Sequence, residues 1–324
     1  MSDIAGRRVG ILVSSLGLLP GGLESTLAGL AAGLADRGAS VTIVAGASAD
    51  GPLSRALRPP STHWIHVPCI AANRPFWHPI ARRRPGLPLA IQSLTFMVGC
   101  AARPDVRALI SGADVTLTAL EVETVLVSRW RAGRPNVSIF PGVIDPKWIR
   151  HDRSTLRLAV SRAVAARTAA RGGVRIDGVL LSGPPPAWLE TPFVVRPIAR
   201  TLLYVGRLEP NKGVLDLVPI LEALAPAFPD LTLRIVGEGP LRAKLAERLD
   251  RSGLSVRAAL PGALPHADVR RELKQADLFL FPSRYESFSQ ALLEAAAVGG
   301  PVVASDVAGN REALGDAARL LPPG

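Results

Sequence analysis

Apolar residues along this chain alternate between short continuous runs and stretches of helical spacing. The run Val9–Val13 is followed by a glycine-rich loop and then by residues 24–37, where leucine and alanine recur on one stripe. Gly38 ends that stretch, as glycine commonly does beyond a helix C-terminus, and Ser40–Ala45 is again apolar. This order predicts a βαβ unit and therefore a parallel sheet.

The rest of the first half is less regular. The segment 87–102 is apolar but shorter than the roughly 20 residues that a membrane-spanning helix needs, so it predicts a buried or interfacial helix. Further strands are expected at residues 62–67, 115–119, 137–140 and 158–161.

A second α/β pattern begins after the proline-dense segment from Pro184 to Pro197, which we interpret as a hinge. Strands alternating with helices of 10–15 residues predict a second doubly wound sheet. The sequence thus predicts two Rossmann-like domains, residues 1–196 and 197–324, with a cleft at the carboxyl ends of both sheets. The strands are expected at 201–205, 231–236, 255–259, 278–281 and 302–304, and the helices at 214–225, 241–251, 267–275 and 290–297.

Composition agrees with a globular protein of the cytoplasm. Of the 324 residues, 48% are hydrophobic and 20% are charged, which excludes a disordered chain. Cys69 and Cys100 have no metal-ligand spacing around them and are expected to be two buried thiols. No apolar segment of the signal-peptide type follows the start.

The positive charge is concentrated in the first half. Residues 1–196 hold 23 Lys and Arg against 12 Asp and Glu, a net charge of +11, whereas residues 197–324 hold 15 of each. The excess includes Arg74 and the run Arg82–Arg84. Such a patch favours a phospholipid surface, a lipid-phosphate acceptor or nucleic acid, and the alternative is a solubilising face. No aromatic-interleaved basic stripe supports nucleic acid, which we do not expect as a partner.

Two short patterns, one of glycines and one of cations, are suited to binding a phosphate group. Gly21 and Gly22 open the first helix, where glycine lets the backbone approach a ligand and free amides attract an anion. Arg207 and Lys212 share one strand-to-helix turn and could neutralise a diphosphate. Each pattern is weak alone, since glycine turns often only relieve crowding and loop cations are usually solvated.

The most specific segment runs from Glu286 to Glu294. Ser287 with Gln290 resembles a capping box, which predicts a helix start near Ser287. The backbones of the two glutamates would then lie roughly 10–12 Å apart. That separation suits carboxylates that bind different hydroxyls of one extended ligand. The alternative is that Glu294 is an ordinary surface charge and Glu286 a residue favoured by the helix dipole.

Together these stretches resemble the retaining glycosyltransferases of family 4, which have the GT-B fold of two Rossmann-like domains. The likeness is dense over residues 201–312 and thin over 50–180. It is carried by Pro20–Glu24, Tyr204–Gly213, Val236–Pro240, and Phe281–Ser283 through Glu286, Glu294 and Gly299–Pro301 to Gly309 and Glu312.

The resemblance assigns roles to residues of this chain. It implies that Arg207 and Lys212 hold the donor diphosphate, which Gly21 and Gly22 approach from the other domain. It also implies that Glu294 binds the nucleotide ribose. Glu286, the catalytic residue, would contact the transferred sugar, with backbone amides around Ser287, Phe288 and Ser289 assisting. The co-substrate is then a nucleotide-diphosphate sugar, and no metal or other cofactor is expected.

Three features depart from the family pattern. Ser287 stands where glycine is common, and Asp114–Ala119 lacks the histidine that many members have near the sugar, leaving Thr118 or Glu121 as the nearest polar side chains. The five histidines, His266 among them, are expected to be surface or packing residues. The helical C-terminal tail that usually returns to the first domain is not seen before Gly324.

The leading prediction is a glycosyltransferase whose acceptor, a glycan, lipid or small molecule, is held by the basic half. Peripheral contact with an anionic membrane would follow from the same charge. The alternative is a non-catalytic relative that binds nucleotide-sugar or scaffolds an active partner. A Rossmann oxidoreductase is disfavoured, because no Gly-x-Gly-x-x-Gly fingerprint follows either first strand.

Overall fold

The chain forms two compact units, Met1–Leu181 and Ser182–Gly324, in the computed structural model. The structure describes residues 4–16, 21–46, 59–72, 83–84, 86–144, 148, 150–172, 175–184, 188 and 199–323. Arg74, Arg82 and His78 lie outside these ranges, as do most residues of the proline-dense segment 184–197. The second unit begins at Ser182 in the sequence, whereas the boundary was expected at 196/197, and Trp188 belongs to the core of the second unit.

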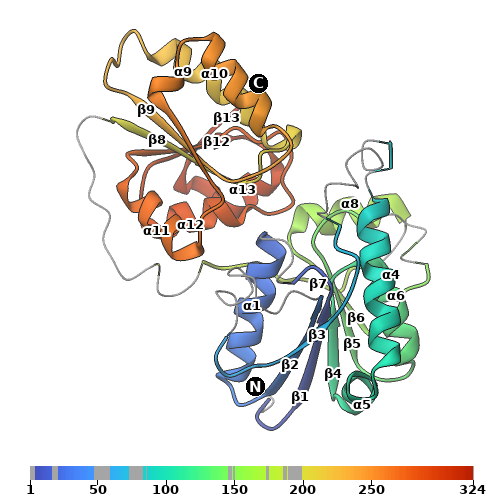
Figure 1. Ribbon diagram of the computed structural model, residues 1–324. Coiled ribbons are helices and arrows are strands. Elements are labelled where there is room, and N and C mark those ends of the chain that lie inside the picture. Colours follow the sequence, from blue (N-terminus) through green and yellow to red (C-terminus); the bar gives the residue numbers. More distant parts are fainter. Residues whose placement is uncertain are drawn as a thin grey trace. The chain divides into compact units, whose positions relative to one another are not determined.

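The N-terminal unit contains one sheet in which every strand pairing is parallel, in the order β3-β2-β1-β4-β5-β6-β7. Helix α1 lies on one face of the sheet, and α4 and α6 lie on the other (Figure 1). Its strands are β1 (Arg8–Val13), β2 (Ser40–Gly46), β3 (His63–Val67), β4 (Val115–Thr118), β5 (Asn136–Phe140), β6 (Leu156–Ala159) and β7 (Gly178–Val179). Its helices are α1 (Gly22–Ala35), α4 (Leu87–Ala102), α5 (Pro104–Gly112), α6 (Glu121–Trp130) and α8 (Arg162–Gly172).

Helix α4 has the predicted bounds and packs as an amphipathic helix. Phe96 and Cys100 on its inner face join Leu12 of β1 and Val44 of β2 in one buried cluster. Within the described ranges, no helix has both the length and the apolar character needed to cross a membrane. Cys100 is buried and Cys69 is half-buried, and both are free thiols. Burial above all raises the pKa of Cys100 to about 12.

The C-terminal unit repeats the architecture with six parallel strands in the order β10-β9-β8-β11-β12-β13. Helices α9 and α10 cover one face, and α11 and α12 cover the other (Figure 1). The strands are β8 (Thr201–Val205), β9 (Thr232–Val236), β10 (Ala258–Gly262), β11 (Leu278–Phe281), β12 (Val302–Ser305) and β13 (Arg319–Leu321). The α-helices are α9 (Leu217–Leu224), α10 (Arg242–Arg251), α11 (His266–Gln275), α12 (Gln290–Val298) and α13 (Ala308–Leu314), and the 3₁₀ turns are η3 (Pro210–Lys212), η4 (Val214–Asp216), η5 (Ser255–Arg257) and η6 (Gly315–Ala317).

Two expected elements of this unit differ in detail. The helix expected at 214–225 is divided into η4 and α9, and the strand expected at 255–259 begins only at Ala258 because η5 precedes it. In both sheets the strand order reverses beside the first strand of the unit, between β1 and β4 and between β8 and β11. Such reversal points are where open α/β sheets bind ligands, beyond the carboxyl ends of the strands.

Candidate functional site

The loop after β8 carries the two predicted diphosphate cations. Arg207 is exposed and pairs with Glu209, Nη1 to Oε1, at 2.8 Å. Lys212 ends η3 and is followed by Gly213, whose φ of +63° falls in the left-handed region. A Cβ at Gly213 would lie 1.8 Å from the carbonyl oxygen of Pro282. Glycine is therefore required here both by the backbone angle and by the close approach of the loop after β11.

Glu286 follows β11 and meets Lys212 across that contact. The Nζ of Lys212 lies 2.7 and 2.8 Å from the two carboxylate oxygens of Glu286, and both side chains are largely buried. Burial raises the pKa of Glu286, and the charges of Lys212 and Arg207 offset part of that effect. The structure thus brings Arg207, Lys212 and Glu286 close enough for their charges to interact.

The same loops approach one another at further glycines. A Cβ at Gly309 would lie 2.4 Å from the carbonyl oxygen of Glu286, and one at Gly237 would lie 1.9 Å from that of Gly206. Asn310 is fully buried beside Gly309 and donates from Nδ2 to the hydroxyl of Ser283 at 3.1 Å. These contacts fix the backbone around the Lys212–Glu286 pair.

Glu294 has a different partner. It lies on α12 with its carboxylate buried, and its Oε1 is 2.8 Å from Nε2 of His266 at the start of α11. Trp188, which is buried, packs its ring against His266 with centroids 4.8 Å apart. The interpretation of His266 as only a surface or packing residue was incomplete. Its place at the start of α11, the helix that follows β10, is the signal that could have identified it.

The predicted capping box is wrong. Helix α12 begins at Gln290 and its N-cap is Ser289, whose Oγ accepts from the amide of Leu292 at 3.4 Å. Gln290 instead donates from Nε2 to the carbonyl oxygen of Gly183 at 3.3 Å. Ser287 and Phe288 consequently remain in the loop between Glu286 and the helix, and a helix start near Ser287 is excluded.

In the N-terminal unit, Gly21 and Gly22 stand at the start of α1, as predicted from the glycine pattern. Gly21 has an extended backbone, and a Cβ there would lie 2.7 Å from Oε2 of Glu24. Glu24 is itself buried and accepts from the hydroxyl of Ser15 at 2.6 Å. A buried carboxylate therefore lies beside the helix start that the sequence assigned to a phosphate, and the phosphate role stays a prediction.

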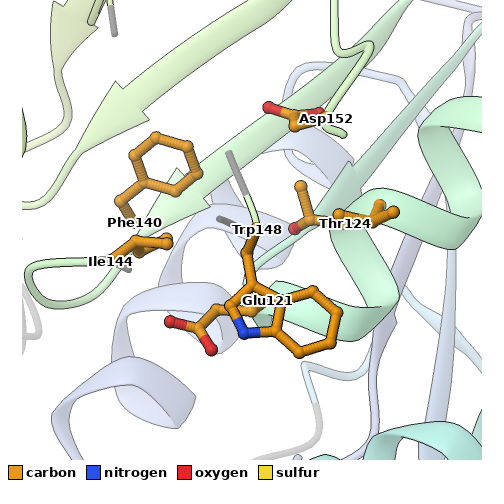
Figure 2. A pocket seen from close by; sticks show the side chains of 7 residues that line it. Glu121, Thr124, Phe140, Ile144, Trp148 and Asp152 are labelled. Carbon is orange, nitrogen blue, oxygen red and sulfur yellow. The ribbon is translucent and has the colours of Figure 1, made fainter. Parts of the chain in front are cut away.

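A small apolar hollow lies at the carboxyl ends of β4 and β5 (Figure 2). Glu121 is on its rim, with the rings of Phe140 and Trp148 nearby. Thr118, the other residue considered in place of a histidine, is buried and accepts a hydrogen bond from Thr124 at 3.1 Å. Glu121 is thus the one of the two that reaches this hollow. Among the described residues, no group of three or more His, Cys, Asp or Glu side chains is arranged to hold a metal ion.

Comparison with known proteins identifies the second unit. Residues 196–323 match the family model of glycosyl transferases group 1. Over the matched residues, the C-terminal unit is similar to group 1 glycosyltransferase domains. This segment contains the whole Lys212–Glu286 group and the His266–Glu294 pair.

Similar proteins agree with that assignment. The chain is 40% identical over 113 residues to glycogen synthase of Mycobacterium tuberculosis, covering 35% of this chain and 27% of that protein. It is 32% identical over 127 residues to 2-deoxystreptamine N-acetyl-D-glucosaminyltransferase of Niallia circulans, covering 39% and 33%. The matched segments are thus a third or less of these relatives. The Anabaena protein HepE, solved in complex with UDP, superposes with a TM-score of 0.66 at 21% identity over 98% of this chain and 86% of that one. The fold of the two units is accordingly that of GT-B glycosyltransferases.

Proposed function

We propose that this chain transfers a sugar from a nucleotide-diphosphate sugar to an acceptor, with retention of anomeric configuration and without a metal ion. The observation that carries the proposal is the buried Lys212–Glu286 pair at the reversal point between β8 and β11, with Arg207 beside it. The family match of this unit and the UDP in the HepE structure support a nucleoside diphosphate as the ligand.

The roles follow from charge and position. Arg207 and Lys212 would stabilise the negative charge that the diphosphate gains as its bond to the sugar breaks, which is how fixed cations lower such barriers. Glu286 would accept hydrogen bonds from hydroxyls of the transferred sugar, and Glu294 would bind the ribose. Backbone amides around Ser287, Phe288 and Ser289 would assist. Gly21 and Gly22 would approach the diphosphate from the N-terminal unit.

The proposal is tested by thermal unfolding of the protein with UDP, GDP, TDP and ADP, followed by diphosphate release from the matching sugar nucleotides. At least one diphosphate should raise the unfolding midpoint. Glu286→Gln should keep that shift while transfer falls by about 100-fold or more. Glu247→Gln, which removes an exposed ion pair on α10, is the control and should change neither readout. Equal loss of binding and transfer in Glu286→Gln would refute the role of Glu286.

Ser287 favours one alternative, a non-catalytic relative that binds nucleotide-sugar or scaffolds a partner. A serine side chain in the loop after Glu286 restricts the space that glycine would leave for the sugar. The same assay separates the two functions. Midpoint shifts without diphosphate release from any sugar nucleotide, in the wild-type protein and in Ser287→Gly, would establish the non-catalytic function.

We propose further that the acceptor is bound by the N-terminal unit, as a glycan, lipid or small molecule, and that the unit works at the inner, anionic face of a membrane. Leu87, Leu94 and Val98 are exposed on α4 at a spacing that places them on one helix face. Arg83 and Arg84 are exposed just before that helix, in the half with the +11 excess. Apolar side chains beside cations are the combination that binds anionic lipid surfaces.

Vesicle sedimentation tests this contact. The protein should bind vesicles that contain phosphatidylglycerol at low salt and leave them at high salt, because charge attraction is screened. Val98→Glu should weaken binding several-fold, whereas Val256→Glu, at a valine 93% exposed in the other unit, should not. Absent or salt-insensitive binding, or equal effects of the two variants, would leave the basic half as a solubilising surface.

A further inference from the structure

Trp188, His266 and Glu294 form a chain of contacts in which each member limits the motion of the next. The indole of Trp188 is 5% exposed and its ring plane is inclined by 37° to the imidazole of His266. His266 also forms a 2.8 Å hydrogen bond from its Nε2 to Oε1 of Glu294. The three residues come from the segment before β8, from the start of α11 and from α12.

The hydrogen bond determines what the carboxylate can still do. A carboxylate only accepts hydrogen bonds, so Nε2 of His266 carries the proton and donates it, in the neutral and in the protonated ring alike. An ionised carboxylate has about four acceptor positions, of which His266 occupies one on Oε1. The remaining positions are available to hydroxyl donors, and the carboxylate that offers them is held in one orientation.

Orientation matters because a free glutamate side chain loses rotamer freedom when a ligand fixes it, and that loss of entropy opposes binding. To accept hydrogen bonds from two neighbouring hydroxyls of a sugar ring, the two carboxylate oxygens must have a defined orientation relative to that ring. The packing of His266 against Trp188 and the hydrogen bond from His266 to Glu294 fix the carboxylate before the ligand binds. Less entropy is then lost on binding, which improves affinity.

We propose that His266 is a positioning residue that, supported by Trp188, orients Glu294 toward the two ribose hydroxyls and so makes the site selective for ribonucleotides. This inference rests on the proposed function, since it takes Glu294 as the ribose-binding group. The substrate class it specifies is a ribonucleoside diphosphate rather than its deoxy counterpart.

A purely structural role of the His266–Glu294 pair can be distinguished from a positioning role by experiment. His266 is a third exposed and Glu294 is buried, so a structural role would appear as a loss of stability and as weaker binding of both forms of the nucleotide. The Arg234–Glu272 pair offers a matched comparison, because it also joins α11 to another element of the same unit and has Nη2 to Oε1 at 2.6 Å. Arg234→Ala should affect stability alone.

The experiment uses UDP, GDP, ADP and the ribose form of TDP. Dissociation constants are measured by calorimetry for whichever of these four diphosphates binds best and for its 2′,3′-dideoxy form. His266→Ala should weaken binding of the ribonucleotide roughly tenfold and leave the dideoxy form unchanged, so the ratio between them falls. His266→Gln, whose amide can donate, should recover part of the ratio. Trp188→Phe should lower the ratio less than His266→Ala, and Arg234→Ala should not change it.

The outcomes separate this inference from the function on which it rests. A wild-type protein that binds none of the four nucleotides overturns both. A wild-type protein that binds while His266→Ala and His266→Gln keep the ratio, or weaken both forms equally, overturns the positioning role alone. Glu294→Gln should lower the ratio at least as much as His266→Ala, and a larger effect of His266→Ala would also contradict the proposal.

Discussion

Each unit buries a glutamate beside the reversal point of its sheet, but the two glutamates are satisfied in different ways. Glu286 has a cation, Lys212, on both carboxylate oxygens. Glu123 on α6 accepts from the backbone amide of Ser14 at 3.0 Å, and its other oxygen is buried without a hydrogen-bond partner in the described part of the chain. Burial raises the pKa of both, and that of Glu123 reaches about 7.

The two glutamates therefore suit different roles. Glu286 can exchange its partner, whereas Glu123 holds a loop in place. The Lys212–Glu286 pair has charges of opposite sign that an incoming diphosphate and sugar could share. Glu123 holds the backbone after β1 through its hydrogen bond to the Ser14 amide, and a protonated carboxyl can accept this bond as well as an ionised one. Three substitutions test that contrast, in order of expected effect.

Lys212→Met should be the most damaging, because it leaves the buried Glu286 without the cation that is hydrogen-bonded to both of its carboxylate oxygens. Breaking a buried pair in this way lowers the free energy of unfolding by about 3–5 kcal/mol, and urea denaturation at pH 8 measures it. The double variant Lys212→Met/Glu286→Gln should regain much of that loss while remaining inactive, because no buried charge is left unpaired. A double variant no more stable than the single one would show that the pair matters for packing rather than charge.

Gly213→Ala should come next, with a loss of more than about 3 kcal/mol, because the new Cβ would meet the Pro282 carbonyl and also requires a left-handed backbone. Gly253→Ala is the matched control. Its φ is +66° but nothing lies within 4 Å of the added atom, so only the backbone cost of roughly 1–2 kcal/mol is expected. Similar losses in the two variants would contradict the close approach of the two loops.

Glu123→Gln should show the smallest change, and it should depend on pH. The pKa of Glu123 is raised from 4.5 to about 7 on folding, so its contribution is retained in acid and is lost as pH rises toward 7. Wild-type stability should therefore fall relative to the glutamine variant by about 2–3 kcal/mol between pH 4.5 and 7, and the difference should level off above about pH 8. A constant difference across the whole range would mean that folding does not raise the pKa of Glu123.

The sequence predicted the two parallel sheets and most strands because buried strands appear as short apolar runs at regular spacing. It predicted the bounds of α4, whose inner positions repeat with the helical period. Helices α5 and α6 were not foreseen, since the thin resemblance over residues 50–180 and the proline-rich turns gave little pattern there. The domain roles of acceptor and donor binding stay predictions.

From the sequence, Lys212, Glu286 and Glu294 were named as site residues, and their roles stay predictions. His266 was missed, and the pairings of these side chains were not indicated. Lys212 and Glu286 are 74 positions apart, and His266 and Glu294 are 28 apart. Only the order of strands brings such residues together, and no local pattern records that order. The helix start at Ser289 was missed for a related reason, because Ser287 and Ser289 offer equally good capping hydroxyls and the path of the loop after Glu286 decides between them.

The glycine contacts among the site loops have a consequence for chimeras. Gly213 lies against Pro282, and Gly309 lies against Glu286. The backbone paths of three segments from separate parts of the chain therefore depend on one another. A grafted Lys212 segment would collide with the Pro282 carbonyl if it carried any residue other than glycine at position 213, and the same holds for position 309 against Glu286. Recombination of this domain should therefore be tolerated where the exchanged segments keep these glycines.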